Sequence, residues 1–333
     1  MEQTVPKVSI IVPCYNSEPY LDAFFKSILA DSYARIELIM VNDGSTDGTE
    51  SKILSYRAQI EQRGGKLLYI RQENQGAAAA ISSGLKVFTG DYLIWPDSDD
   101  ELMNDSISER VAYMEAHKEI ALLITNFVSV REDEPEKVVC NYRRILGRMN
   151  SENFFDDVLE GGGLVGPPVY MARGAVVRER IPDGEIFSLT RSGQNYQMLL
   201  SVCYNNKVAI LPDMGPHYKY FLRPSSHSHT NQKDRESAYA HYDRIGDSIV
   251  ETVRRLPGID RSERQILLER AVALKKNLQL TGSYVFGDDS RFRKLYRQYR
   301  NEKVHISVRN RIRRVIIAFP GLKYLEQTFR KWR

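Results

Sequence analysis

The sequence predicts an α/β fold, in which a mostly parallel sheet is flanked by helices and followed by a helical C-terminal extension. The first 130 residues alternate short β-branched runs with segments of helical periodicity, which is the pattern of βαβ units. From about Asp234 the chain is charged and helical, with no internal repeat or low-complexity tract. A length of 333 residues suits one large domain or two unequal ones. We therefore expect a first domain over residues 1–230 and a helical region over 231–333.

Four strands are expected in the N-terminal part, each followed by a polar loop. They are VSIIVP (8–13), IELIMVND (36–43), LLYI (67–70) and DYLIWPD (91–97). A helix begins after Ser17, which we expect to cap it, and its apolar residues recur at helical spacing from Leu21. The alanine-rich segment 76–88 predicts a second crossover helix that can lie close to its neighbours, and the apolar spacing over 107–114 indicates a third.

The middle of the chain is less regular. Glycines and prolines over 161–168 predict a flexible loop. Residues 192–206 read as a helix, and residues 207–213 and 217–223 read as two further strands.

Charge and cysteine content limit the partners that we expect. The net charge of +4 gives no reason to propose a nucleic-acid partner. Cys14, Cys140 and Cys203 are too scattered for a disulfide framework or a metal finger. The first ten residues lack the basic start and apolar stretch of a secretion signal, so we expect a cytoplasmic protein.

The acidic motif DSDD (97–100) directly follows the fourth predicted strand. In open sheets of this kind ligands bind beyond the carboxyl ends of the strands. A carboxylate pair there, with no Lys or Arg next to it in the sequence, is costly unless a cation neutralises it. Mg²⁺ or Mn²⁺ bound to a diphosphate would do so and would stabilise the departing diphosphate. The alternative is a surface turn in which Asp99 or Asp100 caps the next helix, the role that we assign to Asp100.

The motif NDGSTD (42–47) ends the second predicted strand. Asp43 can accept a hydrogen bond from the imide of a uracil or from a guanine edge, and Gly44 allows a tight turn. Asp47 is expected to cap the next helix. A plain strand-turn-helix connection would need the same residue types, so both interpretations stay open.

Together, SIIVPCYN, VNDGSTDGT and RQENQGAAAAISSGLKVFTGDYLIWPDSDD resemble, in their order and spacing, the family 2 glycosyltransferases of the GT-A fold. The resemblance is close over residues 7–130 and weak to about residue 229. It implies a metal-dependent, inverting transfer of a sugar from a nucleotide diphosphate, with a UDP-sugar as the expected donor. The implied acceptor is a hydroxyl of a glycan or lipid-linked acceptor in bacterial surface polysaccharide synthesis.

The resemblance also implies roles for single residues. Pro13 and Tyr15 would form the base pocket, Asp43 would recognise the base, and Arg71 would reach the nucleotide unless it is simply an exposed strand-end arginine. Asp97 would face the ribose or the Mn²⁺ or Mg²⁺ ion, and Asp99 would bind that metal directly, as in a DXD motif. His227 and His229 resemble a position at which some members place a histidine on the metal or diphosphate, and we take His229 as the metal ligand. Ordinary exposed loop histidines are the alternative.

Two departures from the family pattern concern the donor and the general base. Ile81 and Ser82 replace an Arg-Asn pair, so donor contacts from that helix are not expected. Gln194 and Asn195 replace a Glu-Asp pair whose aspartate is the catalytic base. An amide cannot take a proton at neutral pH. We hypothesise that Asp183 or Glu185 substitutes as the base and that Gln194 or Asn195 orients the acceptor.

The tail over residues 303–333 carries nine Lys or Arg residues against one acid. Its apolar residues recur at helical spacing between arginines, and they are Val304, Val308, Ile312, Val315, Ile316 and Phe319. Such a helix can lie on an anionic membrane surface, where a lipid-linked acceptor would also sit. The alternative is that its apolar stripe docks on the main domain. The apolar run 315–319 is far shorter than the roughly 20 residues that cross a bilayer.

Two other functions remain open. A nucleotidyltransferase can share the α/β core and the carboxylate-bound metal, but PCYNSEP after the first strand has no glycine or lysine to cradle a triphosphate. A non-catalytic nucleotide-sugar-binding module is suggested by Gln194 and Asn195. The retained Asp97 and Asp99 argue against it.

Overall fold

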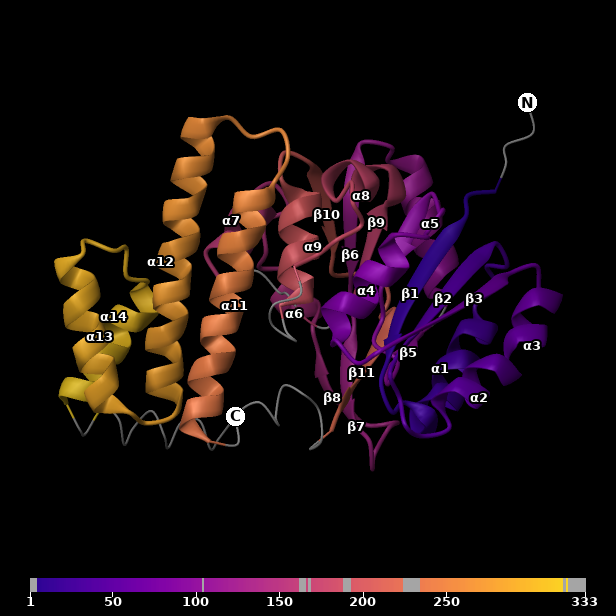
Figure 1. The fold of residues 1–333 in the computed structure, drawn as a ribbon, viewed down its shortest axis with the longest axis horizontal. Helices are drawn as coiled ribbons and strands as arrows, with labels where there is room; N and C mark the ends of the chain where they lie inside the picture. The colour runs from indigo at the N-terminus through magenta and orange to yellow at the C-terminus, as the bar shows by residue number, and fades with distance from the viewer. Residues whose placement is uncertain are drawn as a thin grey trace. The chain divides into compact units, whose positions relative to one another are not determined.

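The computed structural model describes residues 5–103, 105–161, 166, 169–187, 193–223, 234–319 and 322 (Figure 1). The chain divides into an N-terminal unit, residues 1–226 with 255–257, and a C-terminal unit, residues 227–254 with 258–333. The division falls after residue 226, four residues before the boundary placed from the sequence.

A seven-stranded sheet forms the centre of the N-terminal unit. In spatial order its strands are β10 (Lys207–Leu211), β6 (Ile120–Thr125), β9 (Tyr170–Arg173), β4 (Tyr92–Ile94), β1 (Val8–Cys14), β2 (Ile36–Asp43) and β3 (Lys66–Gln72). Strand β9 runs antiparallel to β4 and β6, and the other pairs are parallel. No residue of β1 or β2 is exposed, which explains why these strands are nearly continuous apolar runs.

Helices flank this sheet. They are α1 (Glu18–Ala30), α2 (Thr49–Ser55), α3 (Arg57–Gln62), α4 (Ala77–Leu85), α5 (Ser106–Ala116), α6 (Arg143–Leu146), α7 (Phe154–Leu159), α8 (Gly174–Arg180) and α9 (Gln194–Cys203). Helix α4 packs on β1 and β2, and a Cβ atom on Gly84 would lie 2.5 Å from Cγ2 of Ile11. The small residues of this helix therefore allow the close approach that the sequence predicts.

A second sheet of four strands brings distant segments together. Its spatial order is β5 (Glu101–Leu102), β11 (Tyr218–Leu222), β7 (Val128–Arg131) and β8 (Val138–Asn141). Strand β11 is antiparallel to β5 and parallel to β7. Residues 218–223 therefore lie beside the acidic motif at 97–100, which directly precedes β5.

The predicted α/β fold is confirmed, and the differences are local. The sequence does not predict strands β5, β6, β7, β8 and β9. Strand β9 begins just after the glycine- and proline-rich segment 161–168, most of which lies outside the described residues. Ser17 occupies the N-cap position of α1, but its side chain does not cap that helix. Asp47 accepts hydrogen bonds from the backbone N–H groups of Thr49 and Glu18, the first residues of α2 and α1.

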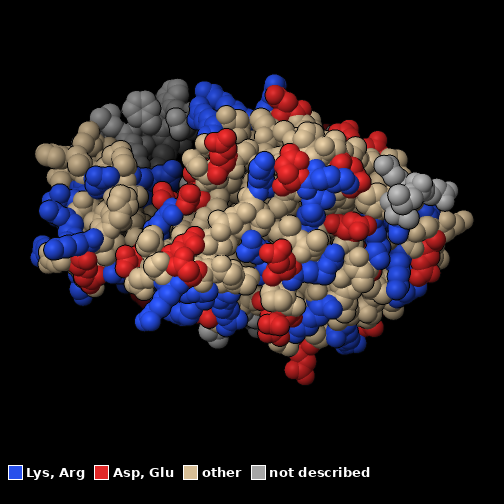
Figure 2. All heavy atoms as spheres, turned by 90° about the horizontal axis from the view of Figure 1, so that it is seen from above, with Lys and Arg blue, Asp and Glu red and all other residues tan. Residues whose placement is uncertain are grey.

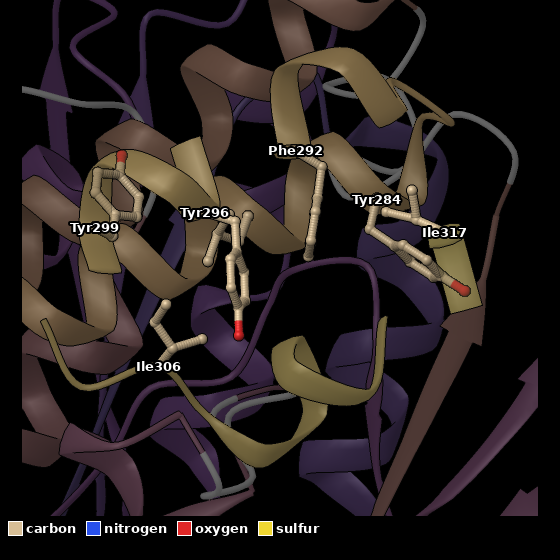
Figure 3. Close-up of a cluster of buried hydrophobic side chains, with 7 residues drawn as sticks. Tyr284, Phe292, Tyr296, Tyr299, Ile306 and Ile317 are labelled. Atoms are coloured by element: carbon tan, nitrogen blue, oxygen red, sulfur yellow. The ribbon is translucent and has the colours of Figure 1, made fainter. Parts of the chain in front are cut away.

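The C-terminal unit is helical. It contains α11 (Arg235–Arg255, whose last residue belongs to the N-terminal unit), α12 (Arg261–Val285), α13 (Asp289–Asn301) and α14 (Val308–Ala318). A buried cluster joins α12, α13, α14 and the loop before α14 (Figure 3), and it consists of Leu280, Tyr284, Phe292, Tyr296, Tyr299, Ile306 and Ile317. Val304 and Ile316 pack against this cluster.

The surface in Figure 2 carries Lys and Arg side chains interspersed with Asp and Glu. This face has no extended field of one sign, in keeping with the small net charge of +4. Within the described ranges, no helix combines the length and apolarity that a membrane crossing requires.

The buried ring of Phe292 should dominate the stability of the C-terminal unit, because it lies between the rings of Tyr284 and Tyr296. We expect Phe292→Ala to lower the free energy of unfolding of this unit by about 3–5 kcal/mol. Phe319 is 61% exposed, so Phe319→Ala is the matched control and should change it by less than about 0.5 kcal/mol. Urea unfolding followed by circular dichroism measures the free energy of unfolding of both variants. An equal loss in Phe292→Ala and Phe319→Ala would contradict the packing described for Phe292.

Candidate functional site

The loops that follow β1, β2 and β4 are tied together at the carboxyl edge of the large sheet. The hydroxyl groups of Ser17 and Ser98 are 2.8 Å apart and hydrogen-bonded. The N–H of Asn16 donates to Oγ of Ser45, and the side-chain oxygen of Asn16 accepts from the N–H of Thr46. The three predicted motifs therefore form one continuous surface, at the edge where ligands bind in such sheets.

Two of the predicted nucleotide-binding residues are accessible at this edge. Tyr15 directly follows β1 and is 48% exposed, while Pro13 is half-buried. Arg71, on β3, is also exposed, and its Nη1 lies 2.9 Å from Oε2 of Glu50 on α2. An aromatic ring that is not packed into the core is available to stack on a planar ligand.

Asp43 is buried and already hydrogen-bonded. Its Oδ1 accepts from Nε2 of Gln72 at 2.8 Å and from the N–H of Gln75 at 2.9 Å. Its Oδ2 accepts from the N–H of Gly76 at 2.7 Å. A carboxylate has about four acceptor positions, so little capacity remains for a base. Asp43 therefore organises the start of α4, a role that the sequence did not suggest, and base recognition by Asp43 stays a prediction.

Asp97 is the least satisfied carboxylate of the acidic motif. Within the part of the chain that the structure describes, no donor is hydrogen-bonded to its side chain. Burial, and secondarily the nearby carboxylate of Asp99, raise the pKa of Asp97 to about 7. A group in this environment gains from a bound cation, which would favour its charged form.

Asp99 does have a cationic partner, which the sequence reasoning missed. Nη1 of Arg223, just beyond β11, lies 3.0 Å from Oδ2 of Asp99, and Nε of Arg223 lies 3.1 Å from Oε1 of Glu132. Arg223 is only 5% exposed, and its guanidinium lies over the rings of Tyr20 and Phe221. The acidic motif has no Lys or Arg next to it in the sequence, but the fold supplies one from 124 residues away.

Asp100 does not cap a helix, because the short strand β5 follows it. Its Oδ2 accepts from the hydroxyl of Tyr218 and its Oδ1 accepts from the N–H of Phe221, both at 2.9 Å. The N–H of Asp97 donates to the same Tyr218 hydroxyl at 3.1 Å. Burial raises the pKa of Asp100 well above its ordinary value, and the charges of Asp99 and Asp97 add to this effect. Asp100 and Tyr218 thus join the acidic turn to β11.

The residues proposed for acid-base chemistry separate into two groups. Asn195, in the first turn of α9 after Gln194, accepts a hydrogen bond from Nε1 of Trp95 at 3.1 Å, so it lies at the carboxyl end of β4. Glu185 instead pairs with Lys86 at 2.8 Å, and Gly184, next to Asp183, lies against the backbone of Leu85 and Lys86.

Lys86 follows the last residue of α4, a helix that begins at the carboxyl edge of the sheet and has nine residues. It therefore lies about 13 Å farther along the helix, towards the opposite edge. A general base must be within hydrogen-bond reach of the hydroxyl that it deprotonates. This placement of Glu185 and of the neighbouring Gly184 argues against Asp183 or Glu185 as that base, and the assignment stays a prediction.

A divalent cation fits the two carboxylates in part. Among the described residues no donor is hydrogen-bonded to the Asp97 side chain, and Oδ1 of Asp99 is not used by Arg223. Among the described residues, no group of three or more His, Cys, Asp and Glu side chains is arranged to hold a metal. His227 and His229 lie outside the described residues. Ligands beyond Asp97 and Asp99 would therefore come from that segment or from a bound diphosphate.

Comparisons with known proteins agree on the N-terminal part of the chain. The family model described as Glycosyl transferase family 2 matches residues 9–161. Glycosyltransferase GlyA of Streptococcus pneumoniae is 35% identical over 152 residues, which cover 46% of this chain and 20% of GlyA. The matched segment thus spans only a fifth of that relative.

Two solved structures share the fold over most of the chain. Mannosyltransferase PcManGT from Pyrobaculum calidifontis, in complex with GDP-Man and Mn²⁺, has a TM-score of 0.59 and 15% identity, covering 99% of this chain and 84% of its own. S. aureus TarS 1-349, in complex with UDP-GlcNAc, has a TM-score of 0.57 and 18% identity, covering 89% and 92%. At these identities the likeness shows the fold alone.

The raised pKa of Asp97 predicts a pH-dependent stability in metal-free buffer. The folded pKa of about 7 lies above the unfolded value of about 3.9, so the folded state holds an extra proton between these values. Stability should fall as pH rises through this window, by at most about 4 kcal/mol. Asp97→Asn should therefore be more stable than the parent at pH 8 and similar at pH 4.

Urea titrations with EDTA at both pH values measure this difference. Asp133→Asn, which changes an exposed aspartate on the turn between β7 and β8, is the matched control and should follow the parent at both pH values. If the free energy of unfolding of the Asp97→Asn variant also equalled that of the parent at both pH values, the environment described for Asp97 would be wrong.

Proposed function

We propose, on the premise that residues 9–161 belong to glycosyl transferase family 2, that the chain transfers a sugar from a nucleotide diphosphate to an acceptor hydroxyl. The expected donor is a UDP-sugar, and the expected acceptor is a glycan or lipid-linked acceptor. The observation that carries the proposal is the joining of Tyr15, Asp97 and Asp99 at one sheet edge, through the hydrogen bond between Ser17 and Ser98. The UDP-GlcNAc and GDP-Man bound by TarS and PcManGT are donors of this class.

The donor would bind across the loops after β1, β2 and β3. The exposed ring of Tyr15 offers a stacking surface for the base, with Pro13 beside it. Arg71 supplies a guanidinium for the nucleotide, since its pairing with Glu50 is exposed and contributes little to stability. Asp43 contributes by holding the N–H groups of Gln75 and Gly76 in place.

Asp97 and Asp99 would hold Mn²⁺ or Mg²⁺ together with the diphosphate, and His229 is retained as a proposed further ligand. A bound ion of this kind stabilises the negative charge that develops on the leaving diphosphate. Arg223 shares Asp99, so it fixes the rotamer of that side chain and leaves Oδ1 available. Direct coordination through Oδ2 would require Arg223 to move.

We propose that Asn195 orients the acceptor and does not deprotonate it. Its Oδ1 is held by Trp95, and its amide NH₂ group has no partner among the described residues. An amide at this position is also the observation that favours the second candidate, a nucleotide-sugar-binding module without catalysis. Turnover of the donor distinguishes these two functions.

The helix α14 supports attachment to an anionic membrane surface. Val308, Ile312, Val315 and Phe319 are exposed and fall on one side of the helix at 100° per residue. The exposed Arg309 and Arg311 flank this stripe on either side. The stripe differs from the predicted one, because Val304 and Ile316 pack on the buried cluster instead. We propose that this face lies in the interface next to a lipid-linked acceptor.

A donor screen tests the proposed transfer. UDP-, GDP- and dTDP-sugars are added with Mn²⁺, and thermal stabilisation and release of free nucleoside diphosphate are measured. We expect a UDP-sugar to stabilise the protein and to be hydrolysed slowly. Asp99→Asn should lower the release by about 100-fold, because one of the two charge-stabilising carboxylates is lost. The Asp133→Asn control should keep full release.

The other two outcomes of the donor screen would each indicate a different function. Stabilisation without release, in the parent as in the variants, would indicate a binding module. A response to nucleoside triphosphates alone would indicate a nucleotidyltransferase.

Co-sedimentation with phosphatidylglycerol vesicles tests the role of α14. Ile312→Glu/Val315→Glu places two charges in the apolar stripe and should release most of the protein from the vesicles. The matched control is Ile266→Glu/Val272→Glu, which changes two exposed apolar residues of α12 and should bind as the parent does. Unchanged binding of the α14 variant would exclude this helix as the anchor.

A further inference from the structure

A shallow cleft of about 640 Å³ lies beside α6, away from the loops that carry Tyr15 and Asp97. Its lining includes Asn141, Arg143, Arg144, Arg148, Pro212 and Asp213. Asp213 is the only acid among the described residues of this lining, and it pairs with Arg143. Arg144 and Arg148 are exposed and have no acidic partner among the described residues. Two guanidinium groups in the cleft therefore have no neutralising acid within the described part of the chain.

The segment around the cleft is unusual in composition. Residues 137–150 contain four cations and no acid. The same segment exposes three large apolar side chains, Val138, Val139 and Ile145. Two of these cations are paired with acids, Lys137 with Glu134 and Arg143 with Asp213, which leaves Arg144 and Arg148 without an acidic partner among the described residues. Unneutralised arginines beside exposed apolar groups are typical of a surface that binds an anionic ligand.

The cleft lies at the same edge of the large sheet as the acidic motif. Pro212 and Asp213 follow β10, and Asn126, which donates to Oδ1 of Asn141, follows β6. Both strands run in the direction of β1 and β4, so their carboxyl ends share one edge. The cleft thus occupies the half of this edge beyond β4, opposite the half where the nucleotide would bind.

Strand β7 connects the cleft to the proposed reaction centre. Its first residue, Val128, pairs with Asn141, which lines the cleft. Its last residue precedes Glu132, which holds Arg223 and through it Asp99. Four residues of strand span about 13 Å. An extended acceptor that reaches the sugar at Asp99 could therefore also reach the arginines.

We propose that this cleft binds a phosphate group of the acceptor, about one strand length from the hydroxyl that receives the sugar. The inference rests on the proposed function and adds the chemical class of the acceptor, a phosphodiester-containing chain. Arginine guanidinium groups bind phosphate oxygens in a bidentate manner, whereas Asp213 already occupies Arg143. The described residues of the lining include no aromatic ring, which would suit a neutral sugar chain.

Binding of a fluorescein-labelled glycerol phosphate oligomer to the full chain tests the proposal by fluorescence anisotropy. We expect Arg144→Ala/Arg148→Ala to weaken binding by about 10- to 100-fold and to reduce its salt dependence. The matched control, Lys66→Ala/Lys118→Ala, removes two exposed cations elsewhere in the N-terminal unit and should bind as the parent does. A labelled dextran of the same length should bind no variant.

Hydrolysis of the donor sugar without acceptor is measured in parallel and should be equal in the parent and both variants. If the parent did not hydrolyse the donor, the proposed function would be contradicted. The binding of the oligomer would still test the phosphate site, because it does not require donor turnover. Unchanged oligomer binding by the arginine variant, or an equal loss in the lysine control, would overturn the phosphate site. The phosphate site would also be overturned if the Arg144→Ala/Arg148→Ala variant lost its binding to phosphatidylglycerol vesicles but still bound the oligomer.

Discussion

Strand β11 holds the acidic turn at residues 97–100 in place, and the rest of the candidate site depends on that attachment. Arg223 neutralises Asp99, while Tyr218 and the N–H of Phe221 satisfy Asp100. Buried carboxylates close together repel each other and lose hydration, so they persist only where partners compensate them. Asp97 is the member without a described partner, and the site therefore keeps one carboxylate whose charged form would be favoured by a cation.

Several features of the fold could be predicted because their causes are local. Strands β1 and β2 are nearly continuous apolar runs, and α4 contains small residues that let it lie against Ile11. Short strands such as β9, with four residues, carry too little pattern to be recognised next to a glycine-rich segment. Helix α14 illustrates an intermediate case: the period of its apolar residues was evident, but which of them pack inward depends on the cluster around Phe292.

The candidate site was predictable in its motifs but not in its partners. Ser17 and Ser98 meet because parallel strands end at one edge, which the order of motifs already implied. Arg223 reaches Asp99 across 124 residues of sequence, and no local signal marks that pairing. Asp183 and Glu185 were chosen because they precede α9 in the sequence, yet the chain places them beside Lys86. Proximity in sequence is a poor guide wherever a helix spans the height of the sheet.

We propose that Asp97 and Asp99 hold a divalent cation opposite a base stacked on Tyr15. The most direct measurement is a crystal structure of the chain with UDP and Mn²⁺, with the metal located by anomalous scattering. We predict a Mn²⁺ peak between the two carboxylates and the diphosphate, with the uracil against the Tyr15 ring. Bound UDP with no metal peak, and with Asp97 facing solvent, would contradict this account.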